Sequence, residues 1–182
     1  LPDLDHPTCE VDGQRKRRYL AELIVPRGSA LVGLDPCADL PTRYPGLAVV
    51  ELIRYSHIFH PCRDAVAIAP DDLLLVKGSP NDLTHILQGK DVDLPLTEKG
   101  IDFGKPDETL VVELIIPPQS SLLGLRLRET YLEREEDLHV VAVERSGLHY
   151  TERKIKDIRL RIGDILLVWC RADRMGKFRG RS

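Results

Sequence analysis

The feature that most constrains this chain is an internal duplication. Residues 20–34 read LAELIVPRGSALVGL, and residues 111–125 read VVELIIPPQSSLLGL. At a constant offset of 91 residues, the identities are Glu22, Leu23, Ile24, Pro26, Ser29, Leu31, Gly33 and Leu34. Arg54 and Arg145 keep this offset, and an offset of 92 then aligns residues 72–76 with 164–168. A register held over this length predicts two copies of one structural unit.

Each copy predicts the same order of elements. An apolar run, at 20–25 or 110–116, predicts a strand that ends at a proline. Ser29 and Ser120 then predict helix caps. Further strands are expected at 47–54 and 138–145, and at 73–76 and 165–169; helices are expected at 126–136 and 81–88. The predicted fold class is therefore α+β, with two tandem small β-α-β-β sandwich-like repeats.

The repeat also predicts the domain organisation. We expect a basic leader or linker at 1–18, a first domain at 19–88, a linker at 89–109, a second domain at 110–176 and a basic tail at 177–182. The linker assignment rests on its glycines and prolines. Units of about 70 residues are marginal for a core of their own. Pairing between the repeats, or with a second chain in a homodimer, is therefore expected.

Composition excludes several classes of function. A net charge of -3 argues against a nucleic-acid partner. No apolar run approaches the roughly 18–20 residues of a membrane-spanning helix. The cysteines, Cys9, Cys37, Cys62 and Cys170, form no Cys-x-x-Cys pair, so reduced thiols and no structural zinc are expected. The chain begins with Leu1 and has Met175 as its single methionine, so we expect a fragment of a longer protein.

Together, these motifs resemble the C-terminal domain of bacterial regulators of potassium conductance, the TrkA-C or RCK-C family. The resemblance lies in Val25–Gly33, Leu47–Arg54 and Asp71–Pro80, and again in 117–124, 140–145 and 162–168. It covers about three quarters of the chain. Gln119 in place of Gly28, Asp71 in place of a usual glycine, and 170–172 in place of Gly-Ser-Pro depart from the pattern.

The resemblance implies a cytoplasmic part of an integral membrane protein. Tandem copies resemble the soluble insert of sodium:anion symporters and of aspartate:alanine-exchanger-like transporters, where the partner is a transmembrane transport domain of the same polypeptide. Basic clusters at both ends of an acidic body fit segments close to a membrane, although polar tails can be basic by chance. No Gly-x-Gly-x-x-Gly follows a strand, so no NAD or other cofactor is expected.

A small anionic or nucleotide-like ligand is the remaining chemical possibility. Free N–H groups at a helix start can hold an anion, and arginines supply charge. The candidate binding residues are Ser29, Gly33, Arg54, Ser120, Gly124 and Arg145. The alternative is that the glycines form tight turns and the arginines cap a sheet edge.

Other candidate sites are weaker. His57, His60 and Cys62 could bind zinc, but a fourth ligand is missing nearby. The serines lack a nucleophile elbow, so no catalytic residue and no enzyme activity is expected. The sequence thus predicts a regulatory or ligand-sensing module of an ion or anion transporter. The alternative is a purely structural oligomerisation module without a ligand.

Overall fold

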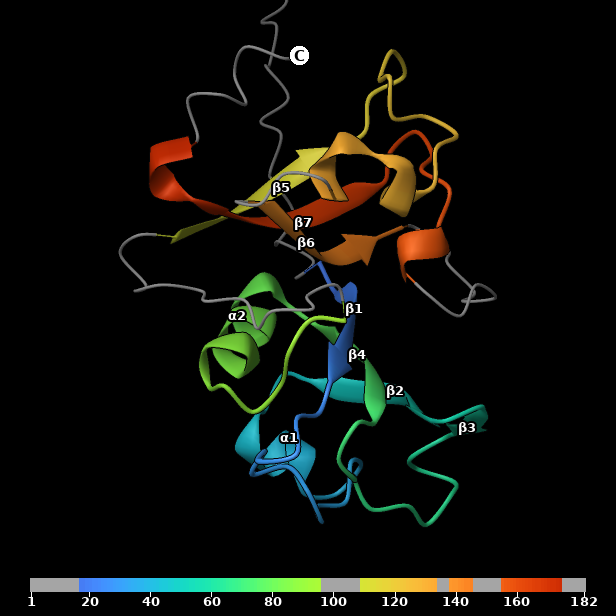
Figure 1. Ribbon diagram of the computed structural model, residues 1–182, viewed down its shortest axis with the longest axis vertical. Coiled ribbons are helices and arrows are strands. Elements are labelled where there is room, and N and C mark those ends of the chain that lie inside the picture. The colour runs from blue at the N-terminus through green and yellow to red at the C-terminus, as the bar shows by residue number, and fades with distance from the viewer. Residues whose placement is uncertain (1–16, 96–108, 134–137, 146–154, 175–182) are drawn as a thin grey trace, which may run out of the picture.

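The computed structural model describes residues 17–95, 109–133, 138–145 and 155–174 (Figure 1). The expected leader up to residue 16, the linker part 96–108, the end of the helix expected at 126–136 and the tail 177–182 lie outside these residues. The strands are β1 (Tyr19–Ile24), β2 (Ala48–Arg54), β3 (His57–Phe59), β4 (Leu73–Gly78), β5 (Thr109–Ile115), β6 (Leu138–Glu144) and β7 (Ile165–Arg171). The α-helices are α1 (Leu40–Arg43) and α2 (Pro80–Gln88).

The seven strands form one antiparallel sheet, in the order β3-β2-β4-β1-β6-β7-β5. This finding corrects the predicted fold class, because the two repeats are not separate α+β sandwich-like domains. The fold is mostly β, since α1 has four residues and α2 has nine. The strands fell near the predicted positions, whereas their assembly into one sheet did not follow from the sequence.

The duplication is still visible inside this sheet. In the first repeat β4 pairs with both β1 and β2, and in the second β7 pairs with both β5 and β6. A β-bulge interrupts β2 between Val49 and Glu51, and another interrupts β6 between Val140 and Ala142. These two bulges are 91 residues apart, as the sequence repeat requires. Within each repeat, equivalent strands therefore pair in the same way and carry the same bulge.

The two halves meet where β1 lies beside β6, with Leu20 opposite Val143 (Figure 1). One apolar cluster crosses this boundary, because Ile165, Leu167 and Trp169 pack in the same core as Leu23 and Leu74. A second cluster, around Leu127, Leu166 and Val168, consists of second-repeat residues alone. Alternate residues of β7 thus face two different cores, and this strand is buried on both faces.

Helix α2 confirms the expected closing helix of the first repeat. Ser79 and Asp82 form a capping box, and Pro80 occupies the first turn. Its buried residues, Leu83, Ile86 and Leu87, join the core that also holds Trp169. The second repeat has Ala172–Arg174 as a 3-10 turn at this point, where the Gly-Ser-Pro motif is missing.

The helix expected at 126–136 does not form an α-helix in the described residues. Residues 127–129 and 131–133 form two 3-10 turns in place of the start of the expected helix at 126–136. Between them Thr130 has an extended backbone, and its hydroxyl donates to the carbonyl of Leu127 at 2.7 Å. That side-chain bond competes with helical pairing, which is why threonine disfavours helix interiors.

Candidate functional site

The two Ser-x-Leu-x-Gly segments form tight turns. The Ser29 N–H donates to the Pro26 carbonyl at 3.0 Å, and its Oγ accepts the Leu31 N–H at 3.0 Å. Gly33 has a φ of +89°, which favours glycine, and its N–H donates to the Ile68 carbonyl at 2.8 Å. The expectation that Ser29 caps a helix is wrong, because its hydroxyl closes a turn.

The second repeat builds the same turn. The Ser120 N–H donates to the Pro117 carbonyl at 3.1 Å, and its Oγ accepts the Leu122 N–H at 3.2 Å. Gly124 has a φ of +77° and donates to the Leu160 carbonyl at 2.9 Å. No helix starts at Ser120 either. The N–H groups of both glycines are therefore bound to carbonyls, which removes the helix-start argument for an anion at these turns.

Arg54 is held by a buried carboxylate. Its Nε donates to Asp72 Oδ1 at 2.7 Å, and its Nη2 donates to Asp72 Oδ2 at 2.8 Å and to the Ala67 carbonyl at 2.7 Å. The side chain of Asp72 is fully buried, and it also accepts the Ala69 N–H at 2.7 Å. The bond to Asp72 raises the pKa of Arg54, so the guanidinium stays charged.

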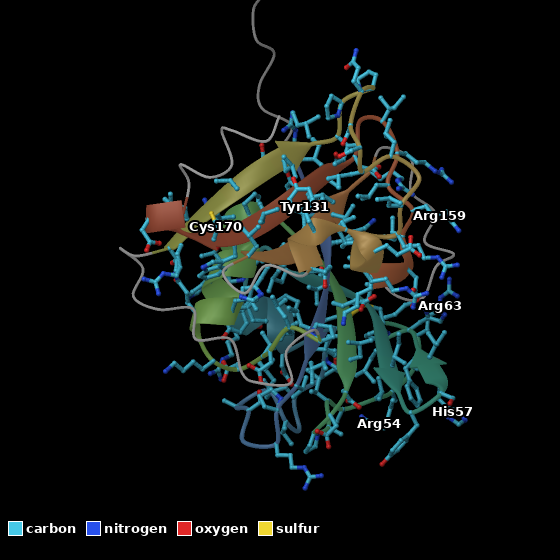
Figure 2. All side chains as sticks on the ribbon, turned by 45° about the horizontal axis from the view of Figure 1, so that its top comes forward. Arg54, His57, Arg63, Tyr131, Arg159 and Cys170 are labelled. Atoms are coloured by element: carbon cyan, nitrogen blue, oxygen red, sulfur yellow. A yellow bond between two sulfur atoms is a disulfide. The ribbon has the colours of Figure 1, made fainter. Side chains whose placement is uncertain are left out.

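Arg145 repeats this arrangement. Its Nε and Nη2 donate to the two carboxylate oxygens of Asp164, each at 2.6 Å, and Nη2 also donates to the Arg159 carbonyl at 2.7 Å. Asp164 accepts the Arg161 N–H at 2.8 Å. Each network ties the end of one strand to the turn before the next strand. Figure 2 places Arg54 and Arg159 well apart, so the two networks are two separate sites.

In the first repeat, Asp91 binds both the Ser29 turn and the side chains of Tyr44 and Arg43. Its backbone carbonyl accepts the Ser29 hydroxyl at 2.6 Å, and its Oδ2 accepts the Tyr44 hydroxyl at 2.7 Å and lies 3.0 Å from Arg43 Nη2. Burial raises the pKa of Tyr44, and the bond to Asp91 adds to this shift. The first part of the predicted linker thus packs on the turn of the first repeat, where Val92 and Leu94 are buried.

The segment with His57, His60 and Cys62, at and after the hairpin of β2 and β3, is joined to Cys37 by a disulfide. Cys62 is bonded to Cys37, which corrects the expectation of reduced thiols at these two positions. The Cys62 sulfur is therefore committed to Cys37, while His57 lies exposed on β3 (Figure 2). In the described part of the chain, no group of three or more His, Cys, Asp or Glu side chains could hold a metal ion. Cys170 is a free, buried thiol whose pKa is raised by burial.

Two glutamates of the duplicated segment connect the repeats. Glu22 of the first repeat accepts the N–H of Ile155 in the second at 2.5 Å. Glu113, its counterpart at the offset of 91, accepts the Tyr19 hydroxyl and lies 3.1 Å from Arg17 in the first repeat. The sequence showed that Glu22 recurs as Glu113, but it did not show that both side chains bind residues of the other repeat. The buried aspartates, Asp72 and Asp164, were missed in the same way.

A small cavity and a wider groove are both lined by described residues. A cavity of about 20 Å³ lies between the repeats, beside Glu22, Leu127 and Ile155. This volume is enough for about one water molecule. A wider groove, open to solvent, is lined by Arg17, Arg18, Pro45, Asn81 and Asp82 among others. Of these two, the groove is the one wide enough for a metabolite-sized ligand.

No helix among the described residues is long and apolar enough to span a membrane. No protein-family model matches the chain, and no solved structure matches it. The chain is similar to Uncharacterized transporter sll0640 of Synechocystis sp., with 27% identity over 158 residues. The match covers 82% of this chain and 26% of that transporter, so the chain spans about a quarter of the relative's length. This similarity links the chain to a transporter-related protein.

Proposed function

We propose that the chain is a regulatory module of a membrane transporter, located on the cytoplasmic side of the membrane. The observation that carries the proposal is the similarity of most of this chain to a quarter of a protein named as a transporter. A transmembrane transport domain in the same polypeptide would then be its partner. The motifs that resemble TrkA-C domains support regulation of ion or anion transport, rather than catalysis, as its role.

The proposed ligand is a small anionic or nucleotide-like metabolite. Among the candidate residues, Arg54 and Arg145 carry the charge for such a ligand, but each already forms a paired contact with a buried aspartate. An anion would have to bind beside these pairs or exchange with the carboxylate. Such a ligand would act by binding one arrangement of the assembly better than another, which shifts the population of states.

A purely structural oligomerisation module, most simply a homodimer, is the second candidate. The hydrogen bonds within the two turn networks favour it, because Ser29, Gly33, Arg54 and their counterparts all have partners inside the chain. In this alternative the duplicated residues hold the strands in register and need no ligand.

Calorimetric titration with nucleotides and cyclic dinucleotides separates the candidates. The regulatory proposal predicts saturable binding by the wild-type chain that is lost in Arg54→Lys or Arg145→Lys. Lysine keeps the charge but cannot form the two-pronged contact with a carboxylate or phosphate. Arg27→Lys is the matched control, because Arg27 forms an exposed pair with Asp71 at 3.5 Å.

The other outcomes are equally informative. Absence of binding for the whole ligand set supports the structural alternative. Binding that survives both arginine changes but is lost in His57→Ala would place the site at the hairpin and contradict the proposed residues.

A further inference from the structure

Two segments of the first repeat meet beside its turn. The N–H of Gly33 donates to the carbonyl of Ile68 at 2.8 Å, and the N–H of Ile68 donates to the carbonyl of Leu34 at 2.9 Å. The disulfide between Cys37 and Cys62 joins the same two segments a few residues away. A covalent bond and a pair of backbone hydrogen bonds therefore hold one junction.

The second repeat makes the same junction without a disulfide. The N–H of Gly124 donates to the carbonyl of Leu160 at 2.9 Å, and the N–H of Leu160 donates to the carbonyl of Leu125 at 2.9 Å. Arg128 stands at the position that corresponds to Cys37, so the covalent bond cannot form here. The backbone pair thus forms in this fold without a disulfide beside it, and it should persist in the first repeat when the bond opens.

Each bonded cysteine also lies in a loop that has hydrogen bonds of its own. The N–H of Cys37 donates to the carboxylate of Asp35 at 2.7 Å. The turn that contains Cys62 is closed by the N–H of Arg63, which donates to the carbonyl of His60 at 2.8 Å. Neither contact involves a sulfur atom. The two thiols should therefore stay near each other after reduction, so that the bond can form again.

The loop at residues 60–66 is held at both of its ends. Strand β3 pairs with β2 up to Phe59, and the carbonyl of Ala67 accepts a hydrogen bond from Arg54 Nη2 at 2.7 Å. Between these two points residues 62–65 are exposed. The bond at Cys62 restrains the loop near its middle, so reduction should loosen the loop and leave its ends in place.

The two bonded cysteines differ in their access to solvent. Cys62 is exposed, whereas Cys37 is half-buried. Because thiol–disulfide exchange needs a thiolate to reach a sulfur atom, Cys62 is the residue that a reductant attacks. Cys170 differs from both, since it is buried and burial raises the pKa of its thiol, which makes it unreactive.

We propose that Cys37 and Cys62 form a reversible redox site that regulates the first repeat, with a dithiol reductant and a low-molecular-weight disulfide as its reaction partners. Oxidation fixes the loop at residues 60–66 to the first turn, and reduction releases this loop while the sheet stays folded. The regulatory role rests on the proposed cytoplasmic location, because disulfides in that compartment are mostly transient, catalytic or redox-sensing.

The exchange transfers two electrons in each direction. In reduction, a thiolate of the dithiol attacks Cys62 Sγ, the disulfide breaks, and Cys37 leaves as a thiolate that takes a proton from water. The second thiolate of the dithiol then displaces Cys62 from the mixed disulfide, and the dithiol becomes a disulfide. In oxidation, the Cys62 thiolate attacks glutathione disulfide and releases one glutathione, and the Cys37 thiolate then attacks Cys62 Sγ and releases the second.

Equilibration of the full chain with mixtures of reduced and oxidised glutathione, without denaturant, tests the proposed site. Free thiols are trapped with an alkylating tag and assigned by peptide mass spectrometry. We expect Cys37 and Cys62 to become tagged together in one reversible transition, while circular dichroism and Trp169 fluorescence remain those of a folded chain. A bond that opens only in denaturant, a chain that unfolds on reduction, or reoxidation to bonds with Cys9 or Cys170 overturns the proposal.

Trypsin measures whether the loop is released. Arg63 is exposed in this loop, and Arg161, exposed in the turn before β7, is the matched control. Cleavage after Arg63 should be at least about tenfold faster in Cys37→Ser/Cys62→Ser than in the oxidised wild type, because the loop opens locally more often. Cleavage after Arg161 should not change. No acceleration at Arg63, equal acceleration at both sites, or an unfolded variant contradicts a local release.

The redox site and the proposed ligand site can fail separately. Failure of the glutathione and trypsin experiments removes the redox site, but the titration with nucleotides still decides whether the chain senses a ligand. Absence of ligand binding, in turn, leaves the redox transition of Cys37 and Cys62 unaffected.

Discussion

At the scale of single residues, the two arginine–aspartate pairs are the contacts on which the duplicated turns depend. Arg54 and Arg145 were identified in the sequence because they keep the 91-residue offset. Their partners were not identified, although Asp72 and Asp164 recur at an offset of 92. The single inserted residue hid the link, since the pairing depends on how the strand and the turn meet in space.

Removing one arginine should destabilise the fold strongly. Arg54→Ala leaves the fully buried Asp72 carboxylate without its counter-charge, and we expect a loss on the order of 3 kcal/mol in the free energy of unfolding. The control, Arg27→Ala, removes an exposed pair and should cost between about 0 and 1 kcal/mol. Urea unfolding measures both. Equal, small losses would show that the buried pair is not structural.

The buried carboxyl of Glu133 makes the stability of the fold depend on pH. Burial raises the pKa of its carboxyl, while Lys156 opposes the shift, and its Oε1 is buried without a hydrogen-bond partner among the described residues. A raised pKa means that the folded state binds the proton more tightly than the unfolded state. Glu133 therefore favours folding when protonated, and this contribution is lost as pH rises through the folded-state pKa.

The change Glu133→Gln should accordingly raise the melting temperature at pH 7–8. The advantage should shrink as pH falls toward the ordinary range of a glutamate, because the wild-type carboxyl is then neutral as well. Melting curves from pH 4 to 8 test this, with exposed Glu129→Gln as a nearby comparison. An advantage that grew toward acid pH would contradict the assigned cause.

At the scale of elements, the strands and the closing helix α2 were predictable, whereas the helix expected at 126–136 did not form in the described residues. The apolar runs before Pro26 and Pro117 predicted two strands. The structure has them as β1 and β5, and each strand ends two residues before its proline. In the first repeat the short helix α1 follows at Leu40–Arg43, but no helix starts at Ser29 or Ser120, because both serines close turns with their own neighbours. Such local bonding competes with helix formation and cannot be separated from capping by residue type alone.

The disulfide between Cys37 and Cys62 is an element-level feature that spacing did not reveal. It joins the loop after the first turn to the loop after β3, across 25 residues of sequence. In the second repeat these positions carry Arg128 and Lys154, and Arg128 instead forms an exposed pair with Asp157 at 3.1 Å. The first repeat thus uses a disulfide at this loop, whereas the second repeat uses an exposed ion pair.

Reduction of this bond should lower stability by about 2–4 kcal/mol, because the unfolded chain gains freedom. Thermal unfolding with and without dithiothreitol measures the effect in the wild type. The double variant Cys37→Ser/Cys62→Ser should melt near the reduced wild type and show no response to the reductant. A reductant effect of the same size in that variant would assign the change to other cysteines. In a reducing cytoplasm the bond is expected to open.

At the scale of the whole molecule, the sheet and its shared core make the two repeats one folding unit. The sequence predicted that the repeats touch, because each is small, but it could not predict how. The contacts of Glu22 and Glu113, and the packing of Trp169 with Leu23, join residues far apart in the chain. No periodicity within one repeat carries information about which edge of it meets the other.

The same geometry explains why the candidate binding residues remain proposals. The sequence predicted that they would recur, and the structure shows that each copy sits in its own turn network. A site shared by both copies would need the networks to converge, and they lie well apart (Figure 2). If a ligand binds, each repeat has to bind it separately or through another surface, such as the open groove beside Arg18.

The most direct test of one shared core is urea unfolding of Leu23→Ala, followed at one protein concentration by Trp169 fluorescence and by far-ultraviolet circular dichroism. Trp169 is the only tryptophan of the chain and lies in the second repeat, whereas Leu23 is fully buried in the first. The change should cost roughly 2–5 kcal/mol. We predict one transition whose midpoint falls equally by both signals. An unchanged Trp169 midpoint, or two separate transitions, would show that the repeats fold as independent domains.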